Sequence, residues 1–570
     1  MQIEPNIEFN TEYNVESNTE RIRRTAKTLF GITMVKPFQM LVMERILEQD
    51  AGAFVRHQLV ILPTGTGKSL CFLVPAVLCK GLTIIVYPLL ALMNDQMAKL
   101  KKAGIGCISP RGGQTRQQRR QIWNKIDEGT KIIMTTPETL LRPEVINRLR
   151  KYRTSLLVID EAHVISQWGK DFRPQYVQLK KAVFELMPKQ VLAFTATASK
   201  ETVGFISQHL FPSKPLVVRG DADRENIVYA VYRCLDKRQA VVDILERCER
   251  PALVFCRTRH ETQQICFESA RDLAARRLAN VNGKPKTHMP ATHPTFPIRY
   301  YHAGLSKCER EGLEKWFSNT KDGVLVTTCA FGMGVDVKSI RTVIHYNLPK
   351  TVEEYLQESG RAGRDGKLSM AWIIKESCKT VQKESDGPST SVSLTSASLS
   401  SVFEGSECRR RGLLRAMGED KDECSGCDVC LGMEMKESKD EAVLKAFTRM
   451  FPFRFSIEKA AYILTGNKDA SVVDQADMCN PFFGALQNWN CTRLKDAIKR
   501  LCSNGRETGI GGVQFCRKGK LLYRNDFSLY NFIAFVLGRV DDGYLWIAET
   551  ARSVRKIIGR RRFREKEQKA

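Results

Sequence analysis

The segment Pro63–Ser69 (PTGTGKS) has the residue types and the spacing of a polyphosphate-binding loop. It follows the apolar run Leu59–Leu62 and precedes a helical pattern, so backbone N–H groups and a helix N-terminus can surround phosphate oxygens. Lys68 would then reach the β- and γ-phosphates, and Ser69 would bind Mg²⁺. Leu62 stands where the general pattern has glycine, and the rest of the pattern is intact. The other predicted contacts of this loop are Thr64, Gly65, Thr66 and Gly67.

A pair of carboxylates ends the apolar stretch Leu156–His163 (LLVIDEAH). Asp160 can hold the Mg²⁺ shell, and Glu161 can orient or deprotonate the attacking water. A single pair of this kind is commonly an acidic strand end that is exposed to solvent. In the same lobe as a phosphate loop, the pair instead indicates an ATP-hydrolysing domain.

Four stretches resemble motifs of the RecQ family of DNA helicases, which belongs to superfamily two, and they occur in the family's order. They are Asp160–Tyr176 (DEAHVISQWGKDFRPQY), Phe194–Ser199 (FTATAS), Phe331–Pro349 (FGMGVDVKSIRTVIHYNLP) and Gln357–Gly366 (QESGRAGRDG). The whole resemblance covers about residues 26–435. The resemblance implies an ATP-dependent DNA helicase of 3′-to-5′ polarity that acts on single-stranded and forked duplex DNA in recombination or repair. The alternatives are an ATP-driven translocase or remodeller that separates no duplex, and a DNA-binding scaffold without hydrolysis.

The resemblance also assigns nucleotide contacts outside the phosphate loop. Phe30–Gln39 (FGITMVKPFQ) is similar to the family's adenine-reading segment, in which Gln39 pairs with the base. Val35 and Lys36 stand where the family usually has an aromatic residue and an arginine, so stacking of Lys36 on the adenine is left open.

The motif GRAGRDG resembles the family's arginine positions in the second lobe. Guanidinium groups suit the charge that develops on a γ-phosphate. We expect Arg364 to be the arginine finger and Arg361 to be a nearby phosphate contact. Gln357 and, in the first lobe, His163 complete the predicted catalytic set.

Polar residues of the first lobe resemble the family's grip on the DNA backbone. They lie in Pro88–Gln96 (PLLALMNDQ) and Thr135–Leu140 (TTPETL). Short polar side chains and N–H groups suit phosphate contacts, which carry no sequence information. The predicted contacts are Asn94, Gln96 and Thr136.

The stretch Ser166–Tyr176 looks like the family's aromatic-rich loop, whose rings would stack on single-stranded bases. Without the resemblance, a buried aromatic cluster would be the better interpretation. Because the loop directly follows the DEAH motif, we expect it to link strand occupancy to Glu161 and His163. The predicted DNA-binding residues are Trp168, Phe172 and Arg173, with Tyr176 as a further stacking face.

Four cysteines have a metal-like spacing: Cys408, Cys424, Cys427 and Cys430. The last three repeat every third residue, which lets thiolates converge on one ion through tight turns. Four thiolates make a closed, structural Zn²⁺ site, and a disulfide is disfavoured inside the cell. RecQ proteins carry the same arrangement after their second lobe.

Short apolar strands alternate with helical patterns from about residue 25 to 375, which is typical of parallel α/β sheets. This pattern indicates two tandem parallel-sheet lobes. The RecQ resemblance implies that they are RecA-like and that a zinc-binding subdomain and a small C-terminal domain, which could be a winged helix, follow them. The strand candidates are Gln58–Leu62, Leu82–Tyr87, Ile132–Thr135, Leu156–Asp160, Val191–Phe194, Ala252–Cys256, Val324–Thr327 and Thr342–Tyr346. The predicted domains are an N-terminal segment (1–25), lobe 1 (26–215), lobe 2 (216–376), a Ser-rich connector with the zinc-binding subdomain (377–435), the winged-helix candidate (436–540) and a basic tail (541–570).

Three regions are interpreted from composition and local pattern. Residues 276–298 are rich in proline and are predicted to be a surface loop inserted into lobe 2. Residues 384–401 are rich in serine and are predicted to be a flexible connector. In the C-terminal domain, Thr492–Ser503 could be a recognition-type helix, and Val513–Cys516 with Leu521–Tyr523 could form a wing. A helical packing domain fits the same pattern.

Lysine and arginine outnumber aspartate and glutamate by 89 to 63, which gives a net charge of +26. Such a field attracts polyanions, although a solubilising surplus is the alternative. Apolar runs such as Leu82–Leu92 fall short of the about 20 residues that span a bilayer, and the polar N-terminus is not a secretory signal. With 18 cysteines expected to be reduced, we predict an intracellular protein, nuclear in a eukaryote or cytoplasmic and nucleoid-associated in a bacterium.

Overall fold

The structure of the chain is a computed structural model. It describes residues 16–50, 57–63, 65–168, 174–221, 223–282, 297–331, 337, 339–376, 399–433, 438–451, 454–469, 471–508, 513–515 and 521–523. The chain divides into two compact units, Met1–Asp223 and Arg224–Ala570. The first unit contains lobe 1, and the second contains lobe 2 with everything that follows it.

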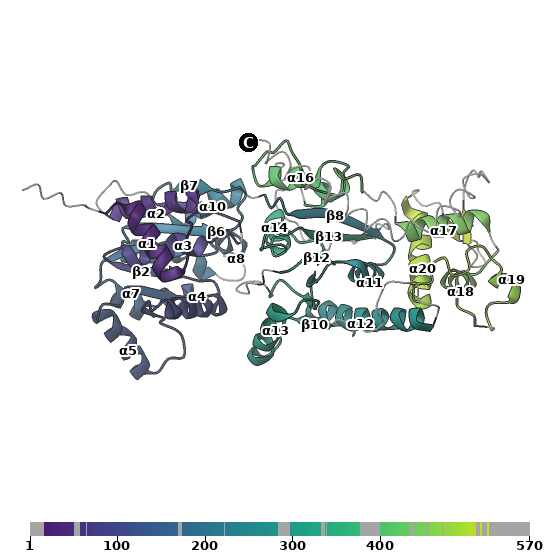
Figure 1. The fold of residues 1–570 in the computed structure, drawn as a ribbon, viewed down its shortest axis with the longest axis horizontal. Helices are drawn as coiled ribbons and strands as arrows, with labels where there is room; N and C mark the ends of the chain where they lie inside the picture. Colours follow the sequence, from purple (N-terminus) through teal and green to yellow (C-terminus); the bar gives the residue numbers. More distant parts are fainter. Residues whose placement is uncertain are drawn as a thin grey trace, which may run out of the picture. The chain divides into compact units, whose positions relative to one another are not determined.

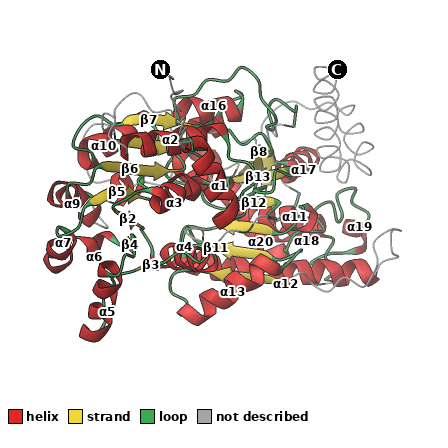
Figure 2. Ribbon diagram, turned by 60° about the vertical axis from the view of Figure 1, so that its left-hand side comes forward, coloured by secondary structure: helices red, strands yellow, loops and turns green. Residues whose placement is uncertain are grey.

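Lobe 1 is built on a seven-stranded parallel sheet with the order β3-β4-β2-β5-β6-β1-β7. Five of its strands are buried along their whole length, because helices cover both faces of the sheet (Figure 2). The strands are β1 (Gln58–Ile61), β2 (Leu82–Val86), β3 (Cys107–Ile108), β4 (Ile132–Thr135), β5 (Thr154–Ile159), β6 (Gln190–Thr195) and β7 (Leu216–Arg219).

The helix α3, which begins where the phosphate loop ends, is held in place by packing against other helices of lobe 1. Residues from α1, α2 and α3 share one hydrophobic core with the strands, and the rings of Phe72 and Phe194 lie 5.0 Å apart within it. The helices are α1 (Asn18–Phe30), α2 (Pro37–Asp50), α3 (Lys68–Leu78), α4 (Leu90–Lys102), α5 (Arg116–Asp127), α6 (Pro137–Leu140), α7 (Pro143–Leu149), α8 (Val164–Trp168), α9 (Leu179–Leu186) and α10 (Lys200–Leu210), with the 3-10 turn η1 (Pro174–Tyr176).

Lobe 2 repeats this architecture with a six-stranded parallel sheet of order β10-β11-β9-β12-β13-β8. Separate hydrophobic clusters cover the two faces of the sheet. The strands are β8 (Ile227–Cys234), β9 (Ala252–Phe255), β10 (Ile298–Tyr301), β11 (Val324–Thr327), β12 (Thr342–His345) and β13 (Ser369–Glu376), and the helices are α11 (Lys237–Arg247), α12 (Arg259–Asn282), α13 (Lys307–Asn319) and α14 (Val352–Ser359).

Residues 399–433, the cysteine segment, pack directly on lobe 2. The segment contains α15 (Leu399–Glu404) and α16 (Arg409–Ala416), which lies beside β8 in Figure 1. Cys427 forms a parallel bridge with Tyr229 of β8, and the rings of Phe403 and Tyr355 meet edge to face at 5.1 Å. The segment therefore shares one hydrophobic cluster with lobe 2.

Residues 438–508 form a C-terminal helical module with its own core. Phe447, Phe455 and Phe482 stack around one another, and Leu235 of lobe 2 reaches into the same cluster. The helices are α17 (Lys439–Met450), α18 (Ile457–Thr465), α19 (Gln475–Met478) and α20 (Cys491–Thr508), and a short antiparallel pair follows with β14 (Val513–Phe515) and β15 (Leu521–Tyr523).

The predicted two-lobe parallel fold is confirmed, and each predicted strand is found within two residues of its expected bounds. The loop prediction for residues 276–298 is wrong at both ends, because α12 continues to Asn282 and β10 begins at Ile298. The connector prediction for residues 384–401 is also wrong at its end, since α15 begins at Leu399. The remainder of both segments lies outside the described residues, as does the basic tail. Among the described helices, none is both long and apolar enough to cross a membrane.

Candidate functional site

The phosphate loop joins β1 to α3 in lobe 1. β1 ends at Ile61, and α3 begins at Lys68 with Gly67 as its N-cap. Gly65 and Gly67 have φ angles of 81° and 85°, which residues with a Cβ rarely adopt. A Cβ at residue 67 would also lie 2.6 Å from Nε2 of Gln39. Both the backbone and the packing of this loop therefore require glycine at residue 67. Thr64 lies outside the described residues.

Lys68 and the two predicted carboxylates meet where β1 and β5 end. Lys68 Nζ lies 3.7 Å from Oε1 of Glu161. Asp160 directly follows β5 and is only 7% exposed. Ligands of open α/β sheets bind outside the carboxyl ends of parallel strands, and both strands end at this edge. The fold thus brings the three residues together at the expected position.

Asp160 has the surroundings of a cation ligand. Burial raises the pKa of its carboxyl group and the neighbouring Glu161 raises it further, whereas Lys68 lowers it. A buried carboxylate beside a second one favours a bound divalent cation, which stabilises the charged form of Asp160. The donor set, completed by Ser69 in the first turn of α3, therefore fits Mg²⁺.

Glu161 and His163 connect the DEAH motif to the FTATAS motif. His163 Nδ1 lies 3.4 Å from Oε2 of Glu161 and 3.1 Å from Oγ1 of Thr195, at the end of β6. The Thr195 hydroxyl donates to the carbonyl of Thr197 at 2.9 Å, so its oxygen is left to accept from His163. This arrangement puts the imidazole proton on Nδ1. The sequence analysis gave Thr195 no role, because only the fold places it beside His163.

Gln39 connects the predicted adenine segment to the phosphate loop. The residue is 4% exposed, and its Nε2 donates to the carbonyls of Thr66 (3.0 Å) and Gly67 (3.3 Å). Its Oε1 accepts from the N–H of Lys36 at 2.9 Å. The Lys36 side chain is exposed, with Nζ 5.8 Å from the centre of the Phe38 ring.

The predicted phosphate-site residues of lobe 2 lie at the end of one helix and in the turn that follows it. Gln357 belongs to α14, and Arg361 and Arg364 lie in the turn that follows it; all three are half-buried. Asp365 accepts from Nη1 of Arg341 at 3.0 Å, which holds the end of the turn. The motif is therefore an ordered turn on lobe 2.

The predicted DNA contacts of lobe 1 differ in exposure. Asn94 is exposed on α4, whereas Gln96 on the same helix is 8% exposed. Thr136 is half-buried, with Oγ1 3.3 Å from the hydroxyl of Thr139. The structure thus places Asn94 and Thr136, but not Gln96, where a side chain reaches solvent.

The aromatic-rich loop is described only at its ends. Trp168 ends α8, and its side chain lies outside the described residues together with Phe172 and Arg173. Tyr176 is completely buried in η1. The expectation that Tyr176 offers a stacking face is therefore wrong, because its ring belongs to the core of lobe 1.

The four predicted zinc cysteines converge. Their sulfur atoms all lie within 4.8 Å of one another. The N–H of Arg411 donates to Cys408 Sγ and the N–H of Cys430 donates to Cys427 Sγ, both at 3.4 Å. The Cys424 thiol lowers the pKa of Cys427 to about 4 by a side-chain hydrogen bond. Both the geometry and the donor chemistry fit a tetrahedral, four-thiolate Zn²⁺ site.

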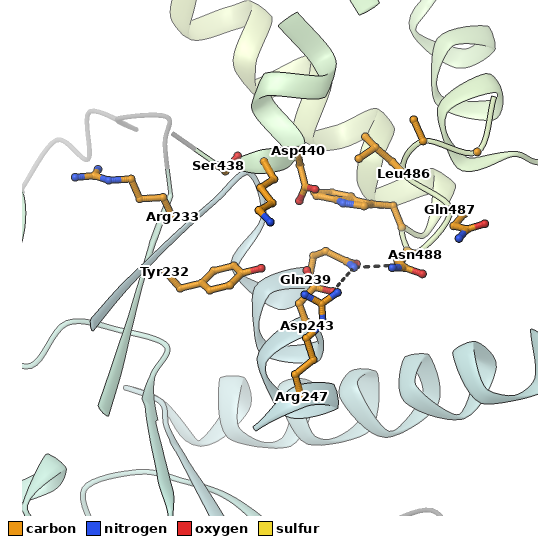
Figure 3. A pocket seen from close by; sticks show the side chains of 14 residues that line it. Tyr232, Arg233, Gln239, Asp243, Arg247, Ser438, Asp440, Leu486, Gln487 and Asn488 are labelled. Carbon is orange, nitrogen blue, oxygen red and sulfur yellow. Dashed lines mark hydrogen bonds between the residues drawn. The ribbon is translucent and has the colours of Figure 1, made fainter. Parts of the chain in front are cut away.

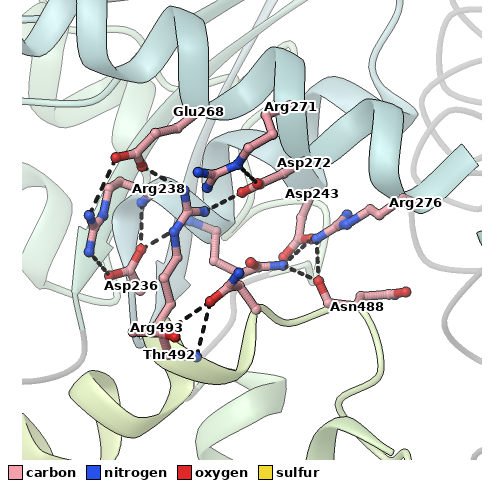
Figure 4. A network of polar contacts seen from close by, with 12 residues as sticks. Asp236, Arg238, Asp243, Glu268, Arg271, Asp272, Arg276, Asn488, Thr492 and Arg493 are labelled. Atoms are coloured by element: carbon pink, nitrogen blue, oxygen red, sulfur yellow. Dashed lines mark hydrogen bonds and ion pairs between the residues drawn. The ribbon is translucent and has the colours of Figure 1, made fainter. Parts of the chain in front are cut away.

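The candidate recognition helix exists as α20, but two of its arginines, Arg493 and Arg500, contact lobe 2. Arg493 lies 2.6 Å from Glu268 and 2.6 Å from Asp272, both on α12. Arg500 lies 2.9 Å from Asp236 at the start of α11. Figure 4 shows Arg493 directed into these carboxylates. We call these contacts the ionic clasp.

A pocket of about 200 Å³ lies beside the ionic clasp, lined by lobe 2 and by the C-terminal helical module (Figure 3). At its wall, Gln239 Nε2 and Arg276 Nη2 both donate to the carbonyl of Asn488 at 3.0 Å. Arg276 also pairs with Asp243 at 2.6 Å and with Glu246 at 2.8 Å. Beside the ionic clasp, side chains of α11 and α12 thus also hold the main chain of the module at Asn488.

Two family models match the chain within these lobes. The model for the DEAD/DEAH box helicase matches residues 36–205, and the model for the helicase conserved C-terminal domain matches residues 236–366. With the two parallel-sheet lobes and the adjacent phosphate loop and DEAH motif, they define a two-lobe helicase.

Relatives that match most of the chain identify one family within this class. The chain is 34% identical over 470 residues to the ATP-dependent DNA helicase RecQ of Pasteurella multocida, which is 80% of this chain and 71% of that protein. It is 35% identical over 358 residues to the probable ATP-dependent DNA helicase RecS of Bacillus subtilis, covering 62% of this chain and 67% of that protein. It is 31% identical over 459 residues to the ATP-dependent DNA helicase RecQ of Bacillus subtilis, covering 78% and 74%. The chain belongs to the RecQ helicase family.

Proposed function

We propose that this chain is an ATP-dependent DNA helicase that moves 3′-to-5′ along single-stranded DNA and separates duplexes in recombination or repair. The observation that carries the proposal is the meeting of Lys68, Asp160 and Glu161 at one sheet edge, in a chain of the RecQ family. The net charge of +26 supports a polyanionic partner.

Each residue of the site has a proposed task in hydrolysis. Lys68 holds the β- and γ-phosphates, and Glu161 orients the attacking water and accepts its proton. His163, whose Nδ1 lies 3.4 Å from Oε2 of Glu161, would hold the Glu161 carboxylate in place. Asp160 and Ser69 would hold Mg²⁺, which neutralises phosphate charge when it is bound.

The arginines of lobe 2 complete the proposed chemistry. We assign Arg364 as the finger that stabilises charge on the γ-phosphate and Arg361 as a second phosphate contact. Gln357 belongs to the same set. ATP binding would bring these groups to the nucleotide and hydrolysis would release them, so that DNA contacts alternate.

The four cysteines are proposed to hold one structural Zn²⁺. The ion would order a segment that has few apolar residues between Cys408 and Cys424. It would take no part in hydrolysis, because a closed four-thiolate site leaves no open position.

The proposal is tested by ATP turnover and strand separation in one preparation. ATPase activity should rise on addition of single-stranded DNA, and a forked duplex with a 3′ tail should be unwound. A matched substrate with only a 5′ tail tests polarity, and a matched RNA duplex tests the substrate class. DNA-stimulated ATPase without separation of any duplex would favour the translocase alternative.

A further inference from the structure

An arginine outside the helicase motifs holds the turn that carries the phosphate arginines. Arg224 Nη1 donates to the carbonyl of Gly360 at 3.2 Å. Its Nη2 donates to the carbonyls of Ala362 and Gly363, at 3.1 and 3.0 Å. One planar guanidinium thus fixes three carbonyls of a single turn, although it lies more than 130 residues away in the sequence.

Asn226, two residues after Arg224, supports the same turn. Its Nδ2 donates to the carbonyls of Gly363 and Lys367, at 2.8 Å each. Gly363 has a φ angle of 57°, and a Cβ there would lie 2.7 Å from the Lys367 carbonyl oxygen. The backbone of the turn therefore fits closely against these two side chains and leaves no space for a side chain at residue 363.

Arg224 is itself held by the cysteine segment. Arg410 is 1% exposed, and its Nη1 donates to the carbonyl of Arg224 at 3.1 Å. Its Nη2 donates to the carbonyls of Ile227 and of Gly426, the latter at 3.3 Å, and its guanidinium lies 5.0 Å from the ring centre of Tyr229. A continuous set of hydrogen bonds thus joins the cysteine segment to the turn.

We propose that Arg224 is a positioning residue for Arg361 and Arg364, with Asn226 as its second support. The inference rests on the proposed ATPase function. A guanidinium presents donors in a rigid fork, whereas a lysine presents one rotating charge and cannot hold three carbonyls in fixed relation. Since a displacement of about 1 Å at a catalytic group can cost about 100-fold in rate, losing this fork should slow hydrolysis without removing any phosphate contact.

The test compares Arg224→Lys with Arg271→Lys, an exposed arginine of α12 in the same lobe. DNA-stimulated ATPase gives kcat and KM, and a fluorescent ATP analogue gives nucleotide affinity. We expect Arg224→Lys to lower kcat about tenfold or more, with KM and affinity within about twofold of the parent. Asn226→Ala should show the same split with a smaller effect, and Arg271→Lys should match the parent. Unchanged kcat in both Arg224→Lys and Asn226→Ala would overturn the inference.

A second arm separates positioning from general damage. In a background of Arg361→Ala and Arg364→Ala, Arg224→Lys should cause no further loss, because it acts only through those two arginines. A further loss of the same size would overturn the positioning role. The background itself tests the proposed function, since loss of a finger should cost about 1,000-fold or more in kcat. A background with full ATPase activity would reject the proposed function, whereas an inactive background beside fully active Arg224→Lys and Asn226→Ala proteins would reject only the inference.

Discussion

Two parts of the chain are attached to lobe 2, and the arginines that hold them have different kinds of partners. The cysteine segment uses Arg410, which is 1% exposed and donates to the main-chain carbonyls of Arg224 and Ile227 in lobe 2. Arg409, which is 0% exposed, joins parts of the segment to one another. The C-terminal helical module uses Arg493 and Arg500, whose partners in lobe 2 are mainly carboxylates, with one longer contact of 3.5 Å from Arg500 to the Leu235 carbonyl. The first attachment is made through hydrogen bonds to main-chain carbonyls, and the second is made mainly through ion pairs.

This difference implies different tasks. A bond to a carbonyl depends little on salt, and several such bonds from one guanidinium fix a backbone geometry. The ion pairs of the clasp are partly buried, with Arg493 6% exposed and its partner carboxylates 15–20% exposed, so they respond to ionic strength less than surface pairs and more than fully buried groups. They hold two elements together without fixing either backbone. The cysteine segment is therefore an integral part of lobe 2 that reaches the turn of Arg361 and Arg364. The ionic clasp holds the helical module, and its contacts can be weakened separately.

The largest expected effect is loss of the cysteine segment. Cys427→Ser should give a poorly soluble or protease-sensitive protein, because Zn²⁺ binding can supply on the order of 10 kcal/mol of ordering energy. Soluble material should still bind nucleotide, since Lys68 and Asp160 belong to the other compact unit. Cys479→Ser, at an exposed cysteine outside the cluster, is the matched control. Metal analysis of the parent checks the premise: far less than one zinc per fully active chain would contradict it.

A smaller effect is expected from the buried charge pair of the same attachment. Arg409 Nε lies 3.1 Å from Oδ1 of Asp428, and Oδ2 of Asp428 accepts from the N–H of Val231. Asp428→Asn leaves Arg409 charged and buried without its counter-ion, which should cost about 3 kcal/mol of unfolding free energy. Urea unfolding at low and high salt measures this loss, which should not depend on ionic strength. A loss that disappears in high salt would remove the contrast with the clasp.

The smallest expected effect concerns the clasp. Arg493→Gln removes two carboxylate contacts from α20 and should weaken docking of the module by about 1–3 kcal/mol. Hydrogen exchange of α20 measures the docking, and a double-mutant cycle with Asp272→Asn isolates the pair. The coupling should shrink only slightly as salt increases, because Arg493 is 6% exposed, and single-stranded DNA binding should be retained. Loss of duplex binding in Arg493→Gln without any change in α20 exchange would instead assign Arg493 to DNA.

The sequence predicted those parts of the site that are contiguous. The phosphate loop, the DEAH pair and the cysteines each lie within one short segment whose residue types reveal its chemistry. Thr195 and Arg224 gave no such signal, because their partners are distant in sequence and meet them only after the sheets form. Composition also misplaced boundaries, most clearly the start of the predicted loop: α12 continues to Asn282 because the prolines of that loop begin only at Pro285.

The burial of Tyr176 and the docking of α20 were not predictable for a related reason. An aromatic residue near a binding loop and an arginine on an amphipathic helix have the same local pattern whether they face solvent, DNA or another domain. Only tertiary packing decides among these, and in this chain it places Tyr176 in the core and Arg493 against Asp272.

The most direct test of the account is ATP turnover by Lys68→Ala, measured with and without single-stranded DNA and followed by unwinding of a 3′-tailed fork. Lys131→Ala, an exposed lysine of lobe 1, is the matched control because it removes the same charge. The account predicts that Lys68→Ala loses both turnover and unwinding while it still binds single-stranded DNA, and that Lys131→Ala keeps all three. DNA-stimulated ATPase that survives in Lys68→Ala would contradict the assignment of Pro63–Ser69 as the phosphate loop.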